Sequence, residues 1–162
     1  MSEPATDLTV DAAVTVEVPA ERAFKVFTER LGSWWLLDRL HIGRQPPETA
    51  VMEPREGGRW YERAADGTEC DWGRVLAWQP HERVVLSWQI GADWQFNPDQ
   101  SRGSEIEVRF TPEGSSRTRV ELTHRGIERH GPGAESIHGA VGSPGGWPGL
   151  LAAYAKAMSD GA

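Results

Sequence analysis

The sequence predicts an α+β fold in which a curved antiparallel sheet surrounds a long C-terminal helix. Residues 143–158 form the longest helical pattern in the chain, with apolar side chains at steps of three and four. Most of the chain before them alternates between apolar and polar residues, which is typical of half-buried strands. Turn residues separate these strands at short intervals. Because a long apolar helix after a run of strands needs a sheet to lie on, the two parts are expected to pack together.

Length and composition indicate one domain and exclude several partner classes. We assign residues 1–9 to a disordered N-terminus and residues 10–160 to a single domain of this 162-residue chain. With 24 acidic and 17 basic residues and no basic run, nucleic acid and membrane surfaces are poor partners. Neither a signal peptide nor an apolar run of about 18 residues is present, and the lone Cys70 cannot form an internal disulfide. These features favour a cytoplasmic location.

The first elements are a strand and two short helices. Ala12, Val14, Val16 and Val18 alternate with polar residues, which predicts a strand that Pro19 ends. A helix follows, whose apolar face contains Ala20, Ala23, Phe24 and Phe27. Gly32 breaks that pattern, and residues 33–37 are expected to form a second short helix or turn.

The alternation of turn residues and strand-like segments in the middle of the chain predicts β-hairpins. Turns at 56–59, 65–68 and 79–82 flank strands at 59–63, 70–78 and 84–90. In the strand 70–78, alternation places Trp72, Arg74, Leu76 and Trp78 on one face. A bulge would reverse this assignment, so the orientations of Trp72 and Trp88 stay open.

The last third of the chain contains two strands, two loops and the helix. Strands at 106–110 and 118–124 form a hairpin. Residues 91–103 form a loop, in which Trp94 and Phe96 are either exposed or folded back over a pocket. Residues 126–146 are rich in Gly and Pro and are predicted to be a long loop, either a lid or a mobile segment. The full helix starts near residues 146–148, because Pro148 is tolerated only in a first turn. Its apolar face contains Leu150, Leu151, Tyr154, Ala157 and Met158.

Several short motifs resemble one protein family in their order and spacing. They are VEVPAERAF (16–24), GGRW (57–60), GRVL (73–76), ERVVLSW (82–88), VELTH (120–124) and GWPGLL (146–151). The first resembles the opening of the START and pollen-allergen-like superfamily, SRPBCC. The others resemble its branch named after the C-terminal domain of the activator of Hsp90 ATPase. The likeness covers about residues 12–158.

The resemblance implies a helix-grip fold, in which a seven-stranded antiparallel sheet holds the C-terminal helix with an apolar cavity between them. It implies little about activity, since members include lipid and hormone binders, polyketide cyclases and chaperone cofactors. Trp residues suit the walls of such a cavity because they combine size with one N–H group. The candidate ligand-binding residues are Trp34, Trp35, Trp60, Trp88, His124, Trp147, Leu151 and Tyr154. Ordinary core packing is the alternative for each indole.

No set of catalytic residues is recognisable, and His124 is the single candidate. It shares a strand face with Val120 and Leu122, so it points inward and could hydrogen-bond to a ligand or act as an acid or base. The alternative, which we prefer, is a core His that binds a backbone carbonyl. Cys70 is interpreted as unreactive, since acidic neighbours raise a thiol pKa. The spacing of His and Cys predicts no metal site, and no cofactor is expected.

Three functions follow as hypotheses. The first is a binding protein that holds a small apolar or aromatic molecule between sheet and helix. The second is a cyclase or dehydratase-type enzyme that uses His124 with a carboxylate or with a tyrosine such as Tyr61 or Tyr154. The third is a chaperone cofactor, which a pull-down with Hsp90 would test and which the absence of a second domain disfavours. A homodimer is left open.

Overall fold

The predicted fold class is confirmed by the computed structural model, which describes residues 8–35, 42–43 and 47–159. Seven antiparallel strands form one sheet in the order β1-β7-β6-β5-β4-β3-β2. Their bounds are β1 (Val10–Val16), β2 (Thr49–Met52), β3 (Arg59–Arg63), β4 (Glu69–Gln79), β5 (Arg83–Trp88), β6 (Ser104–Pro112) and β7 (Thr118–Arg125). The first strand pairs with the last, so the chain returns to the edge where the sheet began.

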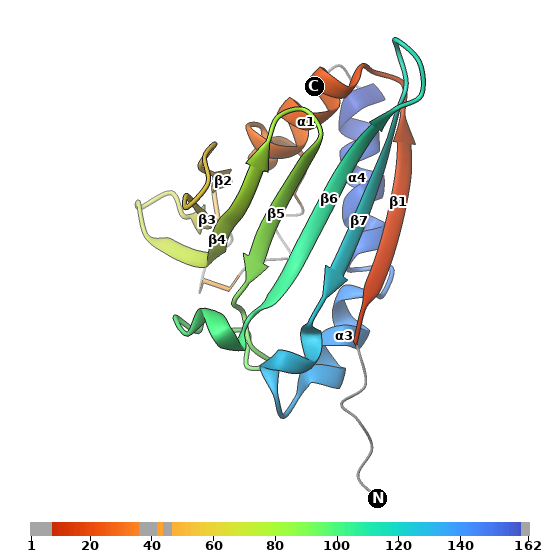
Figure 1. Cartoon of the computed structure of the whole chain (residues 1–162). Helices are drawn as coiled ribbons and strands as arrows, with labels where there is room; N and C mark the ends of the chain where they lie inside the picture. The colour runs from red at the N-terminus through yellow and green to blue at the C-terminus, as the bar shows by residue number, and fades with distance from the viewer. Residues whose placement is uncertain (1–7, 36–41, 44–46, 160–162) are drawn as a thin grey trace, which may run out of the picture.

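Helices cover one face of the sheet. They are α1 (Ala20–Thr28), α2 (Leu31–Trp34), α3 (Ala134–Val141) and α4 (Trp147–Ser159), with short 3₁₀ turns η1 (Gln100–Arg102) and η2 (Ile127–His130). Figure 1 shows α4 running behind β6, β7 and β1, with α1 at one end and α3 at the other. The start of α4 confirms that Pro148 lies in a first turn. None of the helices in the described part of the chain has the length and hydrophobicity that a membrane crossing needs.

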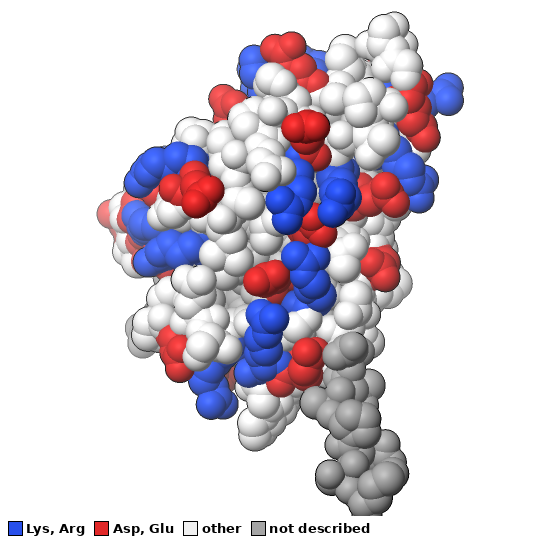
Figure 2. All heavy atoms as spheres, viewed as in Figure 1, with Lys and Arg blue, Asp and Glu red and all other residues white. Residues whose placement is uncertain are grey.

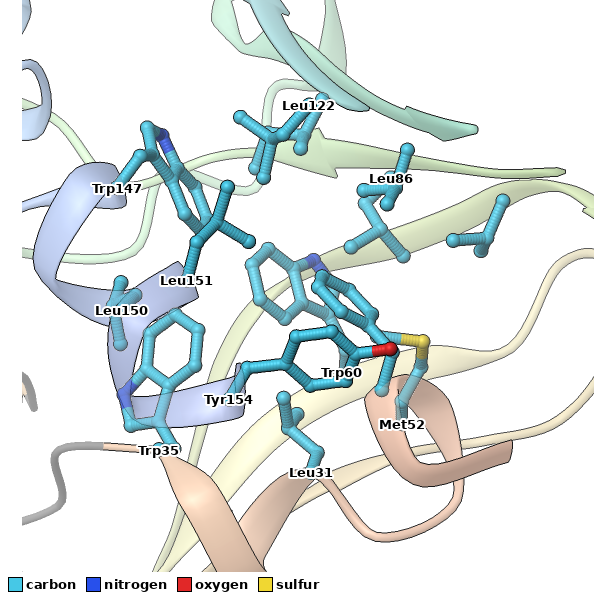
Figure 3. Close-up of a cluster of buried hydrophobic side chains, with 14 of the residues drawn as sticks. Leu31, Trp35, Met52, Trp60, Leu86, Leu122, Trp147, Leu150, Leu151 and Tyr154 are labelled. Carbon is cyan, nitrogen blue, oxygen red and sulfur yellow. The ribbon is translucent and has the colours of Figure 1, made fainter. Parts of the chain in front are cut away.

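The core lies between α4 and the sheet. Figure 3 shows Trp147, Leu151 and Tyr154 of α4 pointing toward Trp60 and Leu86 of the sheet. All five side chains are buried. Burying a side chain of this size typically stabilises the folded state by about 1.5–3 kcal/mol, so this seam holds the helix on the sheet.

The hairpins use the predicted turn chemistry. Gly67, in the Asp66–Gly67 turn between β3 and β4, has a φ of 90°. That left-handed conformation is cheap for glycine alone, because other residues place a Cβ against the backbone. Asp66 Oδ1 also accepts a hydrogen bond from the Thr68 N–H at 2.9 Å, which closes the turn.

Strand β4 corrects the predicted alternation. The pairing of β4 with β5 shifts register between Val75 and Ala77. Its pairing with β3 is also shifted at Trp72, because Tyr61 pairs with Asp71 and Trp60 with Gly73. Trp72 and Val75 are therefore both buried, while Leu76 is only half-buried and does not share their inward face. One inserted residue reverses every later side chain, and alternation in a single strand cannot reveal it.

The predicted long loop at 126–146 is wrong, because it contains η2 and α3. Ala134, Ile137 and Val141 are buried at helical spacing. Gly133, with a φ of 92°, caps the start of α3. The glycines mark the ends of short helices here, and the sequence reading took them as signs of irregular structure. The second predicted helix is also displaced: α2 ends at Trp34, and residues 36–37 lie outside the described residues, as do residues 1–7 of the predicted disordered N-terminus.

The outer face of the sheet is covered by paired charges. Arg125 of β7 donates to Glu107 at 2.9 Å and to Glu105 at 3.2 Å, and Arg83 of β5 also donates to Glu107. Figure 2 shows basic and acidic side chains interspersed over this face. Exposed pairs of this kind contribute little each, but they leave no patch of one sign on the face in view.

Candidate functional site

A cavity of about 440 Å³ lies beside the N-terminal end of α4. Its wall is made of residues from β4, β5, α3, α4 and the connections between them. The lining residues are Trp35, Ile42, Trp72, Trp88, Ile90, Trp94, Ala140, Val141, Ser143, Gly145, Gly146, Trp147 and Leu150. Cavities of ~300–1,000 Å³ with mainly apolar walls are typical of small-molecule sites.

Four buried indoles form the aromatic part of this wall. The rings of Trp35 and Trp72 lie 4.9 Å apart between centroids and are tilted by 34°. Trp147 lies 6.0 Å from Trp35 and 6.0 Å from Trp88, in both cases near edge-to-face. Each of these indoles therefore packs against at least one other indole of the wall.

The indole N–H groups of Trp72 and Trp147 already have hydrogen-bond partners. Trp72 Nε1 donates to Glu62 at 2.9 Å, and Trp147 Nε1 donates to His124 Nδ1 at 2.9 Å. Trp88 differs, because its buried Nε1 has no hydrogen-bond partner among the described residues. Leaving such a donor unpaired typically costs about 1–3 kcal/mol, which makes Trp88 the natural place for an added acceptor.

His124 sits behind the wall and is fully buried. An indole N–H can only donate, so Nδ1 of His124 must accept from Trp147, and the ring proton must lie on Nε2. Nε2 then donates to Ser104 Oγ at 2.6 Å, and Ser104 Oγ is also hydrogen-bonded to His130 Nε2 at 2.9 Å. Both ring nitrogens of His124 are thus hydrogen-bonded to side chains, whereas a hydrogen bond to a backbone carbonyl was predicted from the sequence. Burial, with a smaller effect of His130 and His138, lowers the pKa of His124 to about 3.

This depressed pKa predicts a loss of stability in mild acid. Above pH 6.5 His124 is neutral in both states, whereas between pH 6.5 and about 3 only the unfolded chain takes up the proton. The free energy of unfolding should therefore fall by about 2 kcal/mol from pH 7 to pH 5. Urea unfolding at both pH values checks this, with His124→Gln as the control. An equal pH dependence in the control would contradict the assignment.

Glu62 of β3 is a buried carboxylate that supports the same wall. Its side chain is 2% exposed. Oε1 accepts from Trp72 Nε1 at 2.9 Å and from the Ile42 N–H at 2.6 Å, and Oε2 accepts from the Gly43 N–H at 3.1 Å. Two of these donors belong to lining residues, so one side chain joins β4 to the connection that precedes β2.

The predicted ligand-binding residues fall into two groups. Trp35, Trp88 and Trp147 line the cavity. The other five lie in the core outside the lining set: Trp34, Trp60, His124, Leu151 and Tyr154. Their binding roles stay predictions. The Tyr154 hydroxyl donates to the Ala23 carbonyl at 2.7 Å, and burial raises its pKa, so it is a structural anchor of α4.

Sequence reasoning missed several residues of the site. Glu62 shares the strand parity of Trp60, so an acidic residue on an inward face was the available signal. The orientation of Trp72 was left open, and Trp94 was expected to be exposed or folded back over a pocket without being counted among the ligand-binding residues. Ile42 and the α3 residues carried no signal, because the chain brings them to the cavity from regions without clear periodicity.

A curved antiparallel sheet that holds a C-terminal helix over an aromatic cavity defines this chain as a ligand-binding or cyclase-type protein of the SRPBCC superfamily. A sequence model of the Activator of Hsp90 ATPase homolog 1-like protein family matches residues 17–153, and the chain belongs to this family.

Solved structures agree with this assignment. The chain is 42% identical to the anthrahydroquino-γ-pyrone synthase Txn09, covering 95% of this chain and 99% of that one, with a TM-score of 0.66. It is 27% identical to the self-sacrificing resistance protein CalC from Micromonospora echinospora, with 94% of each chain covered and a TM-score of 0.69. Protein MLL2253 from Mesorhizobium loti shares the fold at 19% identity, 95% and 98% coverage and a TM-score of 0.66. A search of curated proteins finds no match.

Proposed function

We propose that this protein binds a flat aromatic molecule of polyketide type in the cavity beside α4. The observation that carries the proposal is the wall of four buried indoles, Trp35, Trp72, Trp88 and Trp147. Flat rings are the shape that such a wall accommodates best, because they can stack on or pack edgewise against the fixed indoles.

The unpaired N–H of Trp88 favours ligands that carry an oxygen acceptor. A ligand carbonyl or phenol oxygen would satisfy this N–H and remove the cost of its isolation. The nitrogen is covered by protein atoms, so a ligand oxygen would reach it after a small shift of neighbouring side chains. The similarity to the anthrahydroquino-γ-pyrone synthase supports the same class of ligand, an oxygenated polycyclic aromatic compound.

Filling the cavity should weaken ligand binding strongly without destabilising the fold. Ala140 of α3 lines the cavity and is half-buried, so Ala140→Phe places a ring in the ligand's space. Ser136→Phe is the matched control, since Ser136 is exposed on the same helix. We expect wild type and Ser136→Phe to bind 1,8-dihydroxyanthraquinone in calorimetric titrations. At about 100 times Kd the ligand should stabilise them by about 2.7 kcal/mol, which is a rise of several degrees in Tm.

In Ala140→Phe the Kd should rise at least about tenfold while Tm is not lowered. Equal binding by all three proteins would place the ligand outside this cavity. A wild-type protein that binds neither this compound nor related hydroxylated polycycles would refute the proposed function.

A second candidate is a cyclase that acts by holding its substrate in a folded conformation. The similarity to a synthase favours it. Among the described lining residues there is no carboxylate, imidazole or phenol, and the hydroxyl of Ser143 donates to the Ala140 carbonyl at 2.7 Å. Catalysis would therefore rest on proximity and orientation, which can supply several kcal/mol.

The test of this candidate is a substrate that can close a ring. A hydroxyanthraquinone with a β-diketone side chain beside its phenol forms a γ-pyrone with loss of one water, which mass spectrometry detects. Faster ring closure with wild type than with Ala140→Phe or buffer would support the enzyme. Tight binding without acceleration would leave the binding protein as the function.

A further inference from the structure

Trp94 lies at the rim of the cavity on the connection between β5 and β6. It belongs to the lining residues, yet its side chain is 42% exposed. Among the described residues it is the exposed large hydrophobic side chain, whereas the indoles of Trp35, Trp72, Trp88 and Trp147 are buried. Trp94 therefore exposes part of its apolar ring to solvent directly beside an aromatic cavity.

The backbone at this position is costly for a tryptophan. Trp94 has a φ of 59°, and it is the non-glycine residue with positive φ among those described. Glycine and asparagine adopt this left-handed conformation readily, but for a bulky side chain it is unfavourable. Folding alone would therefore favour a smaller residue here. A strained residue at a ligand cavity is a reason to infer a function for its side chain.

The connection that presents Trp94 is well anchored. Asn97 N–H donates to the Gln89 carbonyl at 2.7 Å, and the Gln89 side chain returns a hydrogen bond to the Asn97 carbonyl at 3.1 Å. Ile90 and Phe96 form an antiparallel bridge between these ends. Trp94 is thus held at the tip of a short hairpin at a defined place on the rim.

We propose that Trp94 is a ligand-contacting residue that stacks on the outer face of the bound aromatic ligand and covers it from solvent. This inference rests on the proposed function, because it requires a ligand in the cavity. The buried indoles contact the inner side of the ligand, and Trp94 completes the enclosure. The strain at position 94 is then retained because the indole is needed for binding.

The test is a substitution that separates binding from folding. Trp94→Gly and Trp94→Asn both suit a positive φ and remove the ring, so Tm should stay within about 2 °C of wild type. The Kd for 1,8-dihydroxyanthraquinone should rise about tenfold or more in both variants. Trp94→Phe keeps a flat ring and should lose less affinity. Gln95→Ala, an exposed neighbour outside the lining set, is the control and should bind as wild type.

A second readout does not depend on the variants. The reagent 2-hydroxy-5-nitrobenzyl bromide modifies accessible tryptophans, and peptide mass spectrometry locates the label. Trp94 should be modified in the free protein and protected when 1,8-dihydroxyanthraquinone is bound. Trp78, which is partly buried against Phe24 away from the cavity, should react equally in both cases.

The outcomes distinguish the two proposals. If wild type binds the probe while the Trp94 variants bind equally well and Trp94 stays reactive, the role of Trp94 is refuted and the proposed function stands. A fall in Tm that accounts for the lost affinity would show a structural role and also refute it. If wild type binds neither the probe nor related hydroxylated polycycles, both proposals fail.

Discussion

His124→Ala should lower the free energy of unfolding by about 4 kcal/mol, which corresponds to a fall of roughly 10 °C in Tm. The substitution leaves a cavity in a fully buried site. It also removes the acceptor of the Trp147 N–H, which is left buried and unpaired, and one of the two hydrogen-bond partners of Ser104. Thermal and urea unfolding at pH 7 measure the loss.

The same variant separates two roles of His124. Because it is not among the lining residues, turnover by the bound complex should change little, whereas affinity should fall modestly because the lining residue Trp147 loses its acceptor. His124→Gln, which retains a donor and an acceptor, should recover part of the stability. A His124→Ala protein of wild-type stability that has lost turnover would show that His124 is catalytic after all.

Glu62→Ala should cost about 3 kcal/mol and weaken ligand binding as well. Three N–H donors, from Trp72, Ile42 and Gly43, converge on this buried carboxylate. Without it the Trp72 N–H is left buried and unpaired, and the segment at Ile42 loses its attachment to β3. Both residues line the cavity, so its wall should become less ordered. Chemical unfolding and calorimetric titration measure the two effects.

Two further variants make this prediction specific. Glu62→Gln keeps one acceptor oxygen but places an NH₂ group toward one of the donors, so it should be intermediate. Glu121→Ala removes an exposed glutamate from the outer face of β7 and should change stability by less than about 0.5 kcal/mol. If Glu62→Ala were as harmless as Glu121→Ala, the carboxylate would not support the wall.

Much of the architecture was predictable from local patterns. The Asp66–Gly67 turn, the alternation in β7 and the proline in the first turn of α4 each act over a few residues. The motif order then indicated the sheet and helix arrangement that the structure has. The failures came where the local pattern was interrupted. Two register shifts, at Trp72 and after Val75, changed the inward face of β4, and the glycines around Ala134–Val141 concealed a helix.

The site was less predictable than the fold. The alternation of side chains along the strand correctly predicted that His124 points inward. It could not show that Trp147 and Ser104 are hydrogen-bonded to its two ring nitrogens. The abundance of Trp suggested an aromatic wall without showing that Trp60 packs behind it while Trp94 stands at its rim. From the sequence, Glu62 is a charged residue in a strand, and nothing there indicates that three N–H groups donate to its carboxylate.

The sequence by itself therefore determined the class of fold, the turns and the apolar face of the last helix, because each depends on residues close together in the chain. Only the tertiary structure decided which indoles line the cavity, which hydrogen bonds orient them and which donor is left for a ligand. Those properties depend on side chains from β3, β4, β5, α3 and α4 meeting in space. Their meeting is set by strand pairing and by bulges, and neither is encoded in any single segment.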